Sequence, residues 1–407
     1  MALETLQLSS SLRSESAEVS LEAAKRTATR IGISRVTDIT RLDRVGLPVY
    51  TSVRPRAMRG SLCVNAGKGT RHLEAKVGAY MEAIEFALAE PPAYELTIVS
   101  RTPRDFLTDN CESLGLLDFC PLFRAKLSLD DPIKAVEAVE LIAKKSCFLP
   151  AELVFFPFPA GWQKFSYFGS NTNGLASGND VLEATIHAIF EIIERDCRSF
   201  QFLRDSSRPV VLSSLPPEVH AVFTAIVSAG LQTSLRYCLT EVGVPYFSAI
   251  VVEAGTDDPK WVNTGYGCHA LKEIAATRAF CEALQSRLSS IHGARDDLYT
   301  RHLQFQDWSE SKKKAYLRKA HQHLSDLEEQ ITWTEIPDWK GSFRSLDDLI
   351  QLLLNKLQEV GFSRVCRVIL SPPKCLVKVV RILIPGMEYF THDTPRAGRR
   401  LNEYVCR

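Results

Sequence analysis

The residues best suited to chemistry lie in one stretch of the 407-residue chain, residues 179–198, NDVLEATIHAIFEIIERDCR. Its apolar residues recur at helical spacing, which predicts one long helix that opens at its first two residues. Glu183, Glu191 and Glu194 fall within about 80° of that helix's circumference, beside the apolar stripe that should face the core. Like charges placed in this way repel one another unless a cation lies among them.

An ordinary solvent-facing helix is the alternative explanation for the same residues. Asp180 and Glu183 fit a capping box, in which each end of the motif satisfies a backbone N–H of the other. Glu191 and Arg195 are four residues apart, as are Glu194 and Arg198, and such pairs stabilise many exposed helices. The spacing alone leaves this alternative open.

A second predicted helix, over residues 72–90, carries Glu82 and Glu85 on one face. It follows GKG at 67–69, which we expect to be a small loop carrying a lysine. The loop is not a Walker A motif, because the upstream glycine is missing, and it fits either a plain turn or an anion site. Gly78 costs about 1 kcal/mol relative to alanine inside a helix, so it marks a close approach or simple packing.

Carboxylates on these two helices are compatible with each other if divalent cations bind between them. Mg²⁺ prefers oxygen ligands and is commonly held by a few carboxylates together with phosphate oxygens. An ATP site of this kind needs no P-loop, since Mg²⁺ would bridge the protein to the phosphates while Lys68 and Arg195 neutralise the remaining charge. Spacing does not show that the two helices meet.

The composition excludes several classes of protein. Charge is balanced, with 49 Lys+Arg against 48 Asp+Glu, so neither nucleic acid nor an anionic membrane is an expected partner. The 11 cysteines are scattered without a CxxC pair, which favours a reducing compartment over a disulfide framework. The polar start of the chain is not a targeting signal, and no apolar run is long enough to span a membrane. We therefore expect a soluble, cytoplasmic protein.

The rest of the chain predicts one domain over residues 13–395, between a flexible N-terminus at 1–12 and a basic C-terminal tail at 396–407. The polar, glycine-containing stretch at 170–178 is expected to be a loop that leads into a helix, and at 261–269 two glycines precede another predicted helix. Other predicted helices cover 20–31, 217–229, 271–291, 309–330 and 345–360, and predicted strands cover 34–54, 61–65, 232–239, 246–252, 364–370 and 376–384.

Two segments, GKGTRHLEAKVGAYMEAIE and SNTNGLASGND followed by VLEATIHAIFEIIERD, strongly resemble the YcaO family of ATP-dependent enzymes that modify peptide backbones. The resemblance covers nearly the whole chain and is closest to the stand-alone branch that works with TfuA-type partners. It implies an α+β fold: a single YcaO-like domain of mixed, largely antiparallel sheets with flanking helices. In that fold the ATP site lies between the two glutamate-bearing helices.

The resemblance also implies roles for individual residues. The family's ExxE, NxxxE and ExxER motifs match residues expected to hold Mg²⁺, namely Glu82, Glu85, Glu183, Glu191 and Glu194. Asn179, Arg195 and Lys68 are expected to bind ATP. Arg13 and Ser20 are expected to do so because their spacing matches the family's. Arg278, Gln285 and Arg287 belong to an RAxxExxQxR segment and are also expected to bind ATP. No catalytic residue is assigned. Two positions depart from the family pattern, which has a serine at Gly78 and an arginine at Phe86.

YcaO-like chemistry phosphorylates the oxygen of a peptide amide, after which a nucleophile adds and phosphate departs. The tail lacks the proline-rich end typical of azoline-forming members, which favours thioamide formation with a TfuA-like sulfur-handling partner. Azoline or amidine formation is the first alternative, and a non-catalytic protein that binds nucleotide or a partner is the second. A kinase or ligase is a further class. None of the cysteines is expected to be a nucleophile, since Cys197 and Cys281 lie on apolar helix faces.

The expected partners are a precursor peptide or protein as substrate and a TfuA-like or leader-binding protein that presents it. A homodimer is compatible with the sequence. Neither nucleic acid nor a membrane is expected as a partner.

Overall fold

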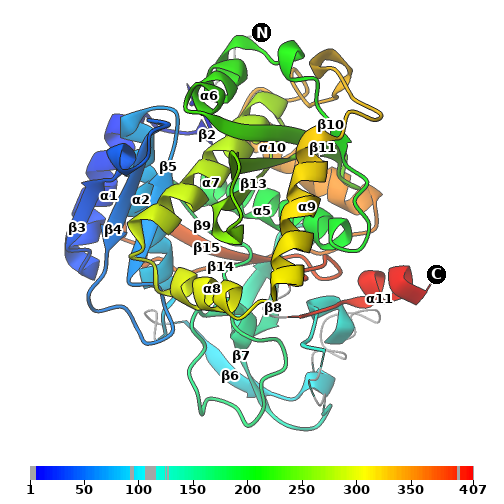
Figure 1. Ribbon diagram of the computed structural model, residues 1–407. Helices are drawn as coiled ribbons and strands as arrows, with labels where there is room; N and C mark the ends of the chain where they lie inside the picture. Colours follow the sequence, from blue (N-terminus) through cyan, green and yellow to red (C-terminus); the bar gives the residue numbers. More distant parts are fainter. Residues whose placement is uncertain are drawn as a thin grey trace. The chain divides into compact units, whose positions relative to one another are not determined.

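The computed structural model describes residues 6–91, 96–105, 116–123, 125, 128–391 and 395–406. The chain divides into two units, and most of their helices and strands are labelled in Figure 1. Unit 1 comprises residues 1–57, 62–83 and 206–342, and unit 2 comprises residues 58–61, 84–205 and 343–407. Because both units are discontinuous in sequence, the sequence shows no boundary between them. The extent of the predicted domain, 13–395, stays a prediction.

Unit 1 contains three antiparallel sheets, none of which follows a parallel βαβ pattern. A two-stranded hairpin lies mostly inside the stretch predicted to be a flexible N-terminus, 1–12, and ends at Arg13; residues 1–5 of that stretch are outside the described residues. The strands, sheet by sheet, are β1 (Leu6–Gln7) and β2 (Leu12–Arg13); β3 (Arg35–Asp38), β4 (Val49–Val53) and β5 (Val64–Lys68); and β10 (Arg208–Pro209), β11 (Leu231–Leu239), β12 (Pro245–Glu253) and β13 (Val262–Cys268).

The helices of unit 1 cover these sheets. α7 packs along β12 and β13, and α6 packs on β11, around a core that includes Val219, Phe247 and Phe280. α1 begins where the Ser16 hydroxyl accepts a hydrogen bond from the N–H of Val19, and it ends at Gly32 as predicted. The helices are α1 (Ala17–Ile31), α6 (Pro217–Ser228), α7 (Lys272–His292), α8 (Asp296–Gln306) and α9 (Glu310–Ser325).

Unit 2 is built on a six-stranded sheet in the order β6-β7-β14-β15-β9, with β8 also paired to β7. α5 packs against β9 and β15, and α10 packs on α5. The strands are β6 (Ile98–Arg101), β7 (Ile133–Glu140), β8 (Lys145–Pro150), β9 (Leu175–Gly178), β14 (Cys366–Ile369) and β15 (Lys378–Leu383). The helices are α4 (Ala151–Val154), α5 (Val181–Gln201), α10 (Leu346–Glu359) and α11 (Arg399–Cys406), the last of which lies within the predicted tail.

The predicted α+β class with largely antiparallel sheets is confirmed, since every ladder between named strands is antiparallel. The chain passes from unit 1 to unit 2 within α2 (His72–Ala89). No helix among the described residues is long and apolar enough to span a membrane.

Two stretches predicted to be loops are partly strands. Gly67 and Lys68 of the GKG stretch pair with β4, and residues 175–178 form β9. Residues 262–268, whose glycines precede a predicted helix, form β13. The predictions failed because glycine is depleted in strands and is usually a sign of a turn.

Glycine is required at these strands because a helix backbone lies directly against them. A Cβ built on Gly67 would lie 2.0 Å from the backbone nitrogen of Ala79, and one on Gly267 would lie 2.0 Å from the carbonyl oxygen of Ala275. Gly178 is similarly close to Ala184 of α5, at 2.6 Å. Gly78 serves the same approach from the helix side, since a Cβ there would lie 3.3 Å from the Cα of Gly67.

We predict that Gly67→Ala destabilises the protein by about 3 kcal/mol or more, because the backbone of α2 at Ala75, Gly78 and Ala79 leaves no room for a methyl group. Gly46→Ala is the control, since Gly46 has φ +77° and open space around its Cβ position, so only the left-handed conformation is penalised, by about 1–2 kcal/mol. Urea denaturation of both variants checks the difference. Equal losses of stability in the two variants would show that the structure around Gly67 rearranges to accommodate the methyl group.

Candidate functional site

The same arrangement of strand and helix occurs three times in the chain. In α2, α5 and α7 an alanine is the fourth residue, and it lies against a glycine of the preceding strand. Each helix then carries two polar side chains, 10 and 13 residues after its first residue. These pairs are Glu82 and Glu85 in α2, Glu191 and Glu194 in α5, and Glu282 and Gln285 in α7. The sequence analysis assigned the first two pairs to Mg²⁺ and, from the third, Gln285 to ATP, without relating the third pair to the other two.

In α2 the two carboxylates are oriented by backbone N–H groups from different strands. The N–H of Ala66 in β5 donates to Glu82 at 2.9 Å. Ser177 in β9 donates to the same oxygen of Glu85 from its backbone, at 2.8 Å, and from its hydroxyl, at 2.7 Å. Each carboxylate therefore has a defined direction before any ligand binds.

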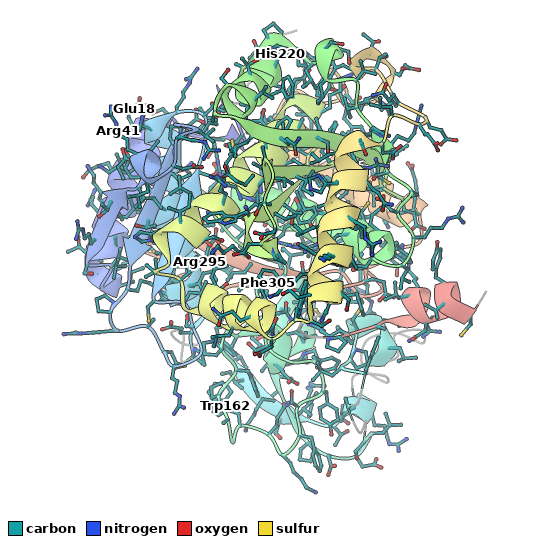
Figure 2. All side chains as sticks on the ribbon, viewed as in Figure 1. Glu18, Arg41, Trp162, His220, Arg295 and Phe305 are labelled. Atoms are coloured by element: carbon teal, nitrogen blue, oxygen red, sulfur yellow. The ribbon has the colours of Figure 1, made fainter. Side chains whose placement is uncertain are left out.

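Burial raises the pKa of Glu82, and the nearby cations Arg295 and Lys68 lower it again in part. Arg295, labelled in Figure 2, directly precedes α8 and forms an ion pair with Asp297 at 2.8 Å. Neither Arg295 nor Asp297 was identified as a site residue from the sequence, because they lie outside the helix motifs. A carboxylate whose charged form is disfavoured is one that a bound cation would stabilise.

At the start of α5, Asn179 and Glu183 form one local unit. Asp180 caps the helix by accepting a hydrogen bond from the N–H of Glu183 at 2.8 Å. The Glu183 side chain reaches back and accepts the Asn179 backbone N–H at 3.2 Å and its side-chain amide at 2.9 Å. The four-residue spacing of this motif is therefore explained by mutual orientation at a helix start.

Further along α5, Arg195 lies near Glu191 and Glu194, with N–O distances of 3.8 and 4.0 Å. Glu183 and Glu194 are only 2% and 4% exposed. The alternative of an ordinary solvent-facing helix is therefore wrong for these two carboxylates. Burying a carboxylate is costly unless it is hydrogen-bonded or compensated by positive charge.

In α7 the equivalent pair contacts β5 directly. Lys68 donates to Glu282 at 3.0 Å, and the Gln285 amide donates to the carbonyl of Ala66 at 2.5 Å. The peptide of Ala66 is thus held by Glu82 on its N–H side and by Gln285 on its carbonyl side. Lys68, predicted to face nucleotide, has a carboxylate partner within unit 1.

The remaining predicted nucleotide-binding residues have different surroundings in unit 1. Arg13 donates to the Ser11 hydroxyl at 3.1 Å, and the buried Ser20 donates to the carbonyl of Ser16 at 2.8 Å. Arg287 is buried and forms ion pairs with Asp43 at 3.0 Å and with Glu253 at 2.9 Å. Two carboxylates already compensate Arg287, which makes it an anchor of α7. Its contact with nucleotide stays a prediction, as do those of Arg13 and Ser20.

Positive charge gathers near the start of α7. Burial, and then the charges of Arg278 and Arg13, lower the pKa of His269 to about 3, so its imidazole is neutral at pH 7. Its Nδ1 accepts the N–H of Leu271, which directly precedes the helix. Because Arg278 and Arg13 make this region positively charged, it is a suitable environment for an anion.

The two departures from the family pattern have structural explanations. Gly78 lets the helix and β5 approach closely, as described above. Phe86 is buried and makes an edge-to-face contact with Phe156, with ring centroids 5.6 Å apart. The position of the family's arginine is therefore part of the apolar core of unit 2.

The cysteines are consistent with packing roles. Cys197 and Cys281 are both buried, and burial raises the pKa of the Cys281 thiol to about 12. A thiol protonated at pH 7 is a poor nucleophile.

The five predicted metal ligands are distributed over the chain, with Glu82 in unit 1 and the other four in unit 2. Within the described ranges no three His, Cys, Asp or Glu side chains are grouped closely enough to hold an ion as they stand. The assignment of Glu82, Glu85, Glu183, Glu191 and Glu194 as one ligand set therefore stays a prediction.

Comparison with known proteins identifies the family. A family model described as YcaO cyclodehydratase, ATP- and Mg²⁺-binding, matches residues 66–388. The chain belongs to the YcaO cyclodehydratase family. ATP and Mg²⁺ are accordingly the cofactors of this YcaO protein, as predicted.

Relatives and solved structures agree with this membership. An uncharacterised protein of Methanothermobacter thermautotrophicus is 33% identical over 92% of this chain and 94% of its own length. An uncharacterised protein from the tfuA 3′ region of Rhizobium leguminosarum bv. trifolii is 29% identical over 88% of this chain and 84% of its own. The fold is similar to that of YcaO from Methanopyrus kandleri, solved with AMPPCP and Mg²⁺, with a TM-score of 0.75, 22% identity and 97% of each chain covered.

We predict that Glu82→Gln stabilises the metal-free YcaO protein at pH 7. Because burial raises the pKa of Glu82, the folded state binds its proton more tightly than the unfolded state, and this contribution to stability is lost as the pH rises above the ordinary glutamate value. Glutamine keeps an acceptor for Ala66 and does not titrate, so its advantage should shrink between pH 7 and pH 4. Denaturation midpoints across that range measure it. A difference in midpoint between the two proteins that does not change with pH would contradict the raised pKa of Glu82.

Proposed function

We propose that this YcaO protein uses ATP and Mg²⁺ to phosphorylate the oxygen of a peptide backbone amide, and that the modified product is a thioamide. The observation that carries the proposal is the pair of buried carboxylates Glu183 and Glu194 on α5, the first of them oriented by Asn179. Buried carboxylates at the positions of the family's nucleotide motifs have a physical reason to bind a cation.

The donor set fits Mg²⁺. All five proposed ligands, Glu82, Glu85, Glu183, Glu191 and Glu194, supply carboxylate oxygens, which this hard cation prefers. Backbone N–H groups already orient Glu82, Glu85 and Glu183, so little side-chain entropy would be lost on binding. Bound Mg²⁺ would supply positive charge to the phosphates of ATP.

The other proposed contacts are those of basic and amide side chains with ATP. Arg195 keeps about a quarter of its side-chain surface exposed, at 26%, and its pairs with Glu191 and Glu194 are long. We infer that its guanidinium turns toward phosphate when nucleotide binds, together with Arg13, Lys68 and Arg278. In this reaction the protein contributes mainly positioning and charge neutralisation.

The choice of thioamide over azoline or amidine rests on two observations. The relative from Rhizobium leguminosarum lies in a tfuA 3′ region, and the resemblance is closest to members that work with TfuA-type partners. We therefore propose a precursor peptide or protein as substrate and a TfuA-like protein as partner. Azoline or amidine formation is the alternative outcome of the same amide activation.

A non-catalytic nucleotide-binding protein is the second candidate. It is favoured by Phe86, because a buried aromatic side chain cannot supply the charge of the family's arginine. Turnover of ATP that depends on peptide would exclude it.

We predict that Glu191→Gln and Glu194→Gln each weaken Mg·ATP binding by about tenfold or more, since each removes one charged ligand, worth about 1.4 kcal/mol or more. Titration calorimetry of the purified chain measures the dissociation constants. Glu310→Gln is the control, because Glu310 is 77% exposed and lies on α9. Unchanged binding in both α5 variants would contradict the metal assignment.

We further predict that the protein, a TfuA-like partner, sulfide, Mg·ATP and a peptide substrate together yield ADP, phosphate and a peptide in which sulfur replaces one oxygen. Mass spectrometry of the peptide distinguishes the products, because azoline formation removes water without adding sulfur. Release of AMP, or a stable phosphopeptide, would instead indicate a ligase or a kinase.

A further inference from the structure

The last turns of α5 are anchored by a segment that lies far away in the sequence. The backbone N–H of Glu388 donates to Asp196 at 2.7 Å, and that of Phe390 donates to the hydroxyl of Ser199 at 2.9 Å. Further along the chain, Arg400 of α11 donates to the same oxygen of Asp196 at 2.6 Å. All of these residues belong to unit 2. The segment 386–406 therefore holds α5 immediately beyond the positions of its proposed metal ligands.

The ion pair of Arg400 and Asp196 is largely shielded from water. The Asp196 side chain is 8% exposed and that of Arg400 is 25% exposed. The Arg400 guanidinium also lies 5.0 Å from the ring centres of Phe200, on α5, and of Phe362. Tyr404 of α11 makes an edge-to-face contact with Phe200, with ring centroids 5.5 Å apart. Removing one partner of a buried pair leaves a charge without compensation, which is far more destabilising than losing a surface ion pair.

The buried Glu388 fixes the position of α11 itself. Its carboxylate accepts the N–H groups of Gly398, at 2.6 Å, and of Leu401, at 2.9 Å, so negative charge lies at the start of this helix, where it is favourable. A Cβ built on Gly398 would lie 2.7 Å from Oε1 of Glu388, which explains the glycine. Leu401 is buried on the other side of this cap. Arg400 is therefore presented to α5 from a helix whose place is set.

Asp196 lies on a different side of α5 from the proposed metal ligands. At about 100° per residue it is roughly 140° around the helix axis from Glu191. Near its start α5 is fixed by the approach of Ala184 to Gly178 of β9. Glu191 and Glu194 lie between that contact and Asp196, so both ends of the stretch that carries them are held.

We propose that Arg400 and Asp196 are positioning residues for the reaction. Their ion pair holds the last turns of α5 so that Glu191 and Glu194 meet Mg·ATP in a fixed geometry. The proposal rests on the proposed function, in which these glutamates bind Mg²⁺. Residues that orient metal ligands without touching the metal typically contribute about 10- to 100-fold to metal affinity.

Substitutions in α11 test the proposal by titration calorimetry of Mg·ATP. Arg400→Ala should weaken binding about tenfold, because Asp196 loses its countercharge and the end of α5 shifts to expose it. Arg400→Lys keeps a cation and should recover most of the affinity. Arg399→Ala is the matched control and should bind as the native protein does, since Arg399 pairs with Asp118, at 3.3 Å, and not with α5. Equal losses in Arg400→Ala and Arg399→Ala would overturn the proposal.

Hydrogen exchange without nucleotide separates this anchor from the proposed function. In Arg400→Ala the amides of residues 196–201 should exchange about tenfold faster, while those of α10 keep their native rates. Arg400→Gln, which keeps a donor without the charge, gives the same test if Arg400→Ala does not fold. Native protein that fails to bind Mg·ATP would contradict the proposed function, and exchange would still show whether Arg400 holds α5. Unchanged exchange at 196–201, or faster exchange with native affinity, would overturn the positioning role.

Discussion

The contact of a glycine in a strand with the backbone of the following helix is the constraint on which the site depends. At Gly67, Gly178 and Gly267 any side chain would meet helix backbone. These contacts fix how far each helix can slide along its strand. Because the polar pairs lie 10 and 13 residues after the first residue of each helix, the same contacts also determine where those pairs fall relative to the sheet.

Hydrogen bonds from backbone N–H groups then fix the direction of the carboxylates that these helices carry. Glu82 and Glu85 accept N–H groups from β5 and β9, and Glu183 accepts those of Asn179. Glu183 is also buried, so it has lost most of its hydration. In the proposed function, carboxylates oriented in this way would bind a cation with little reorganisation.

The sequence predicted the helices well because their apolar spacing is regular. α2, α7 and α10 agree with prediction within two residues at each end, and α5 extends three residues beyond its predicted end. It failed where glycine serves a strand, since Gly67 and Gly178 resemble turn signals unless the neighbouring helix is known. The motif glutamates were identified from the resemblance. Arg295 was not, because it lies between two predicted helices and Glu82, a carboxylate near it, is distant in sequence.

The polar pair of α7 differs in chemistry from the pairs of α2 and α5. Gln285 donates its amide N–H to the Ala66 carbonyl, a bond that a glutamate at the same position could not make. Glu282 is left as the single carboxylate of its pair, and the ammonium of Lys68 lies 3.0 Å from it. This carboxylate is therefore compensated within unit 1 by Lys68 and by the nearby charge of Arg295. In α2 and α5 both positions are carboxylates, and in the proposed function that doubled negative charge favours a divalent cation.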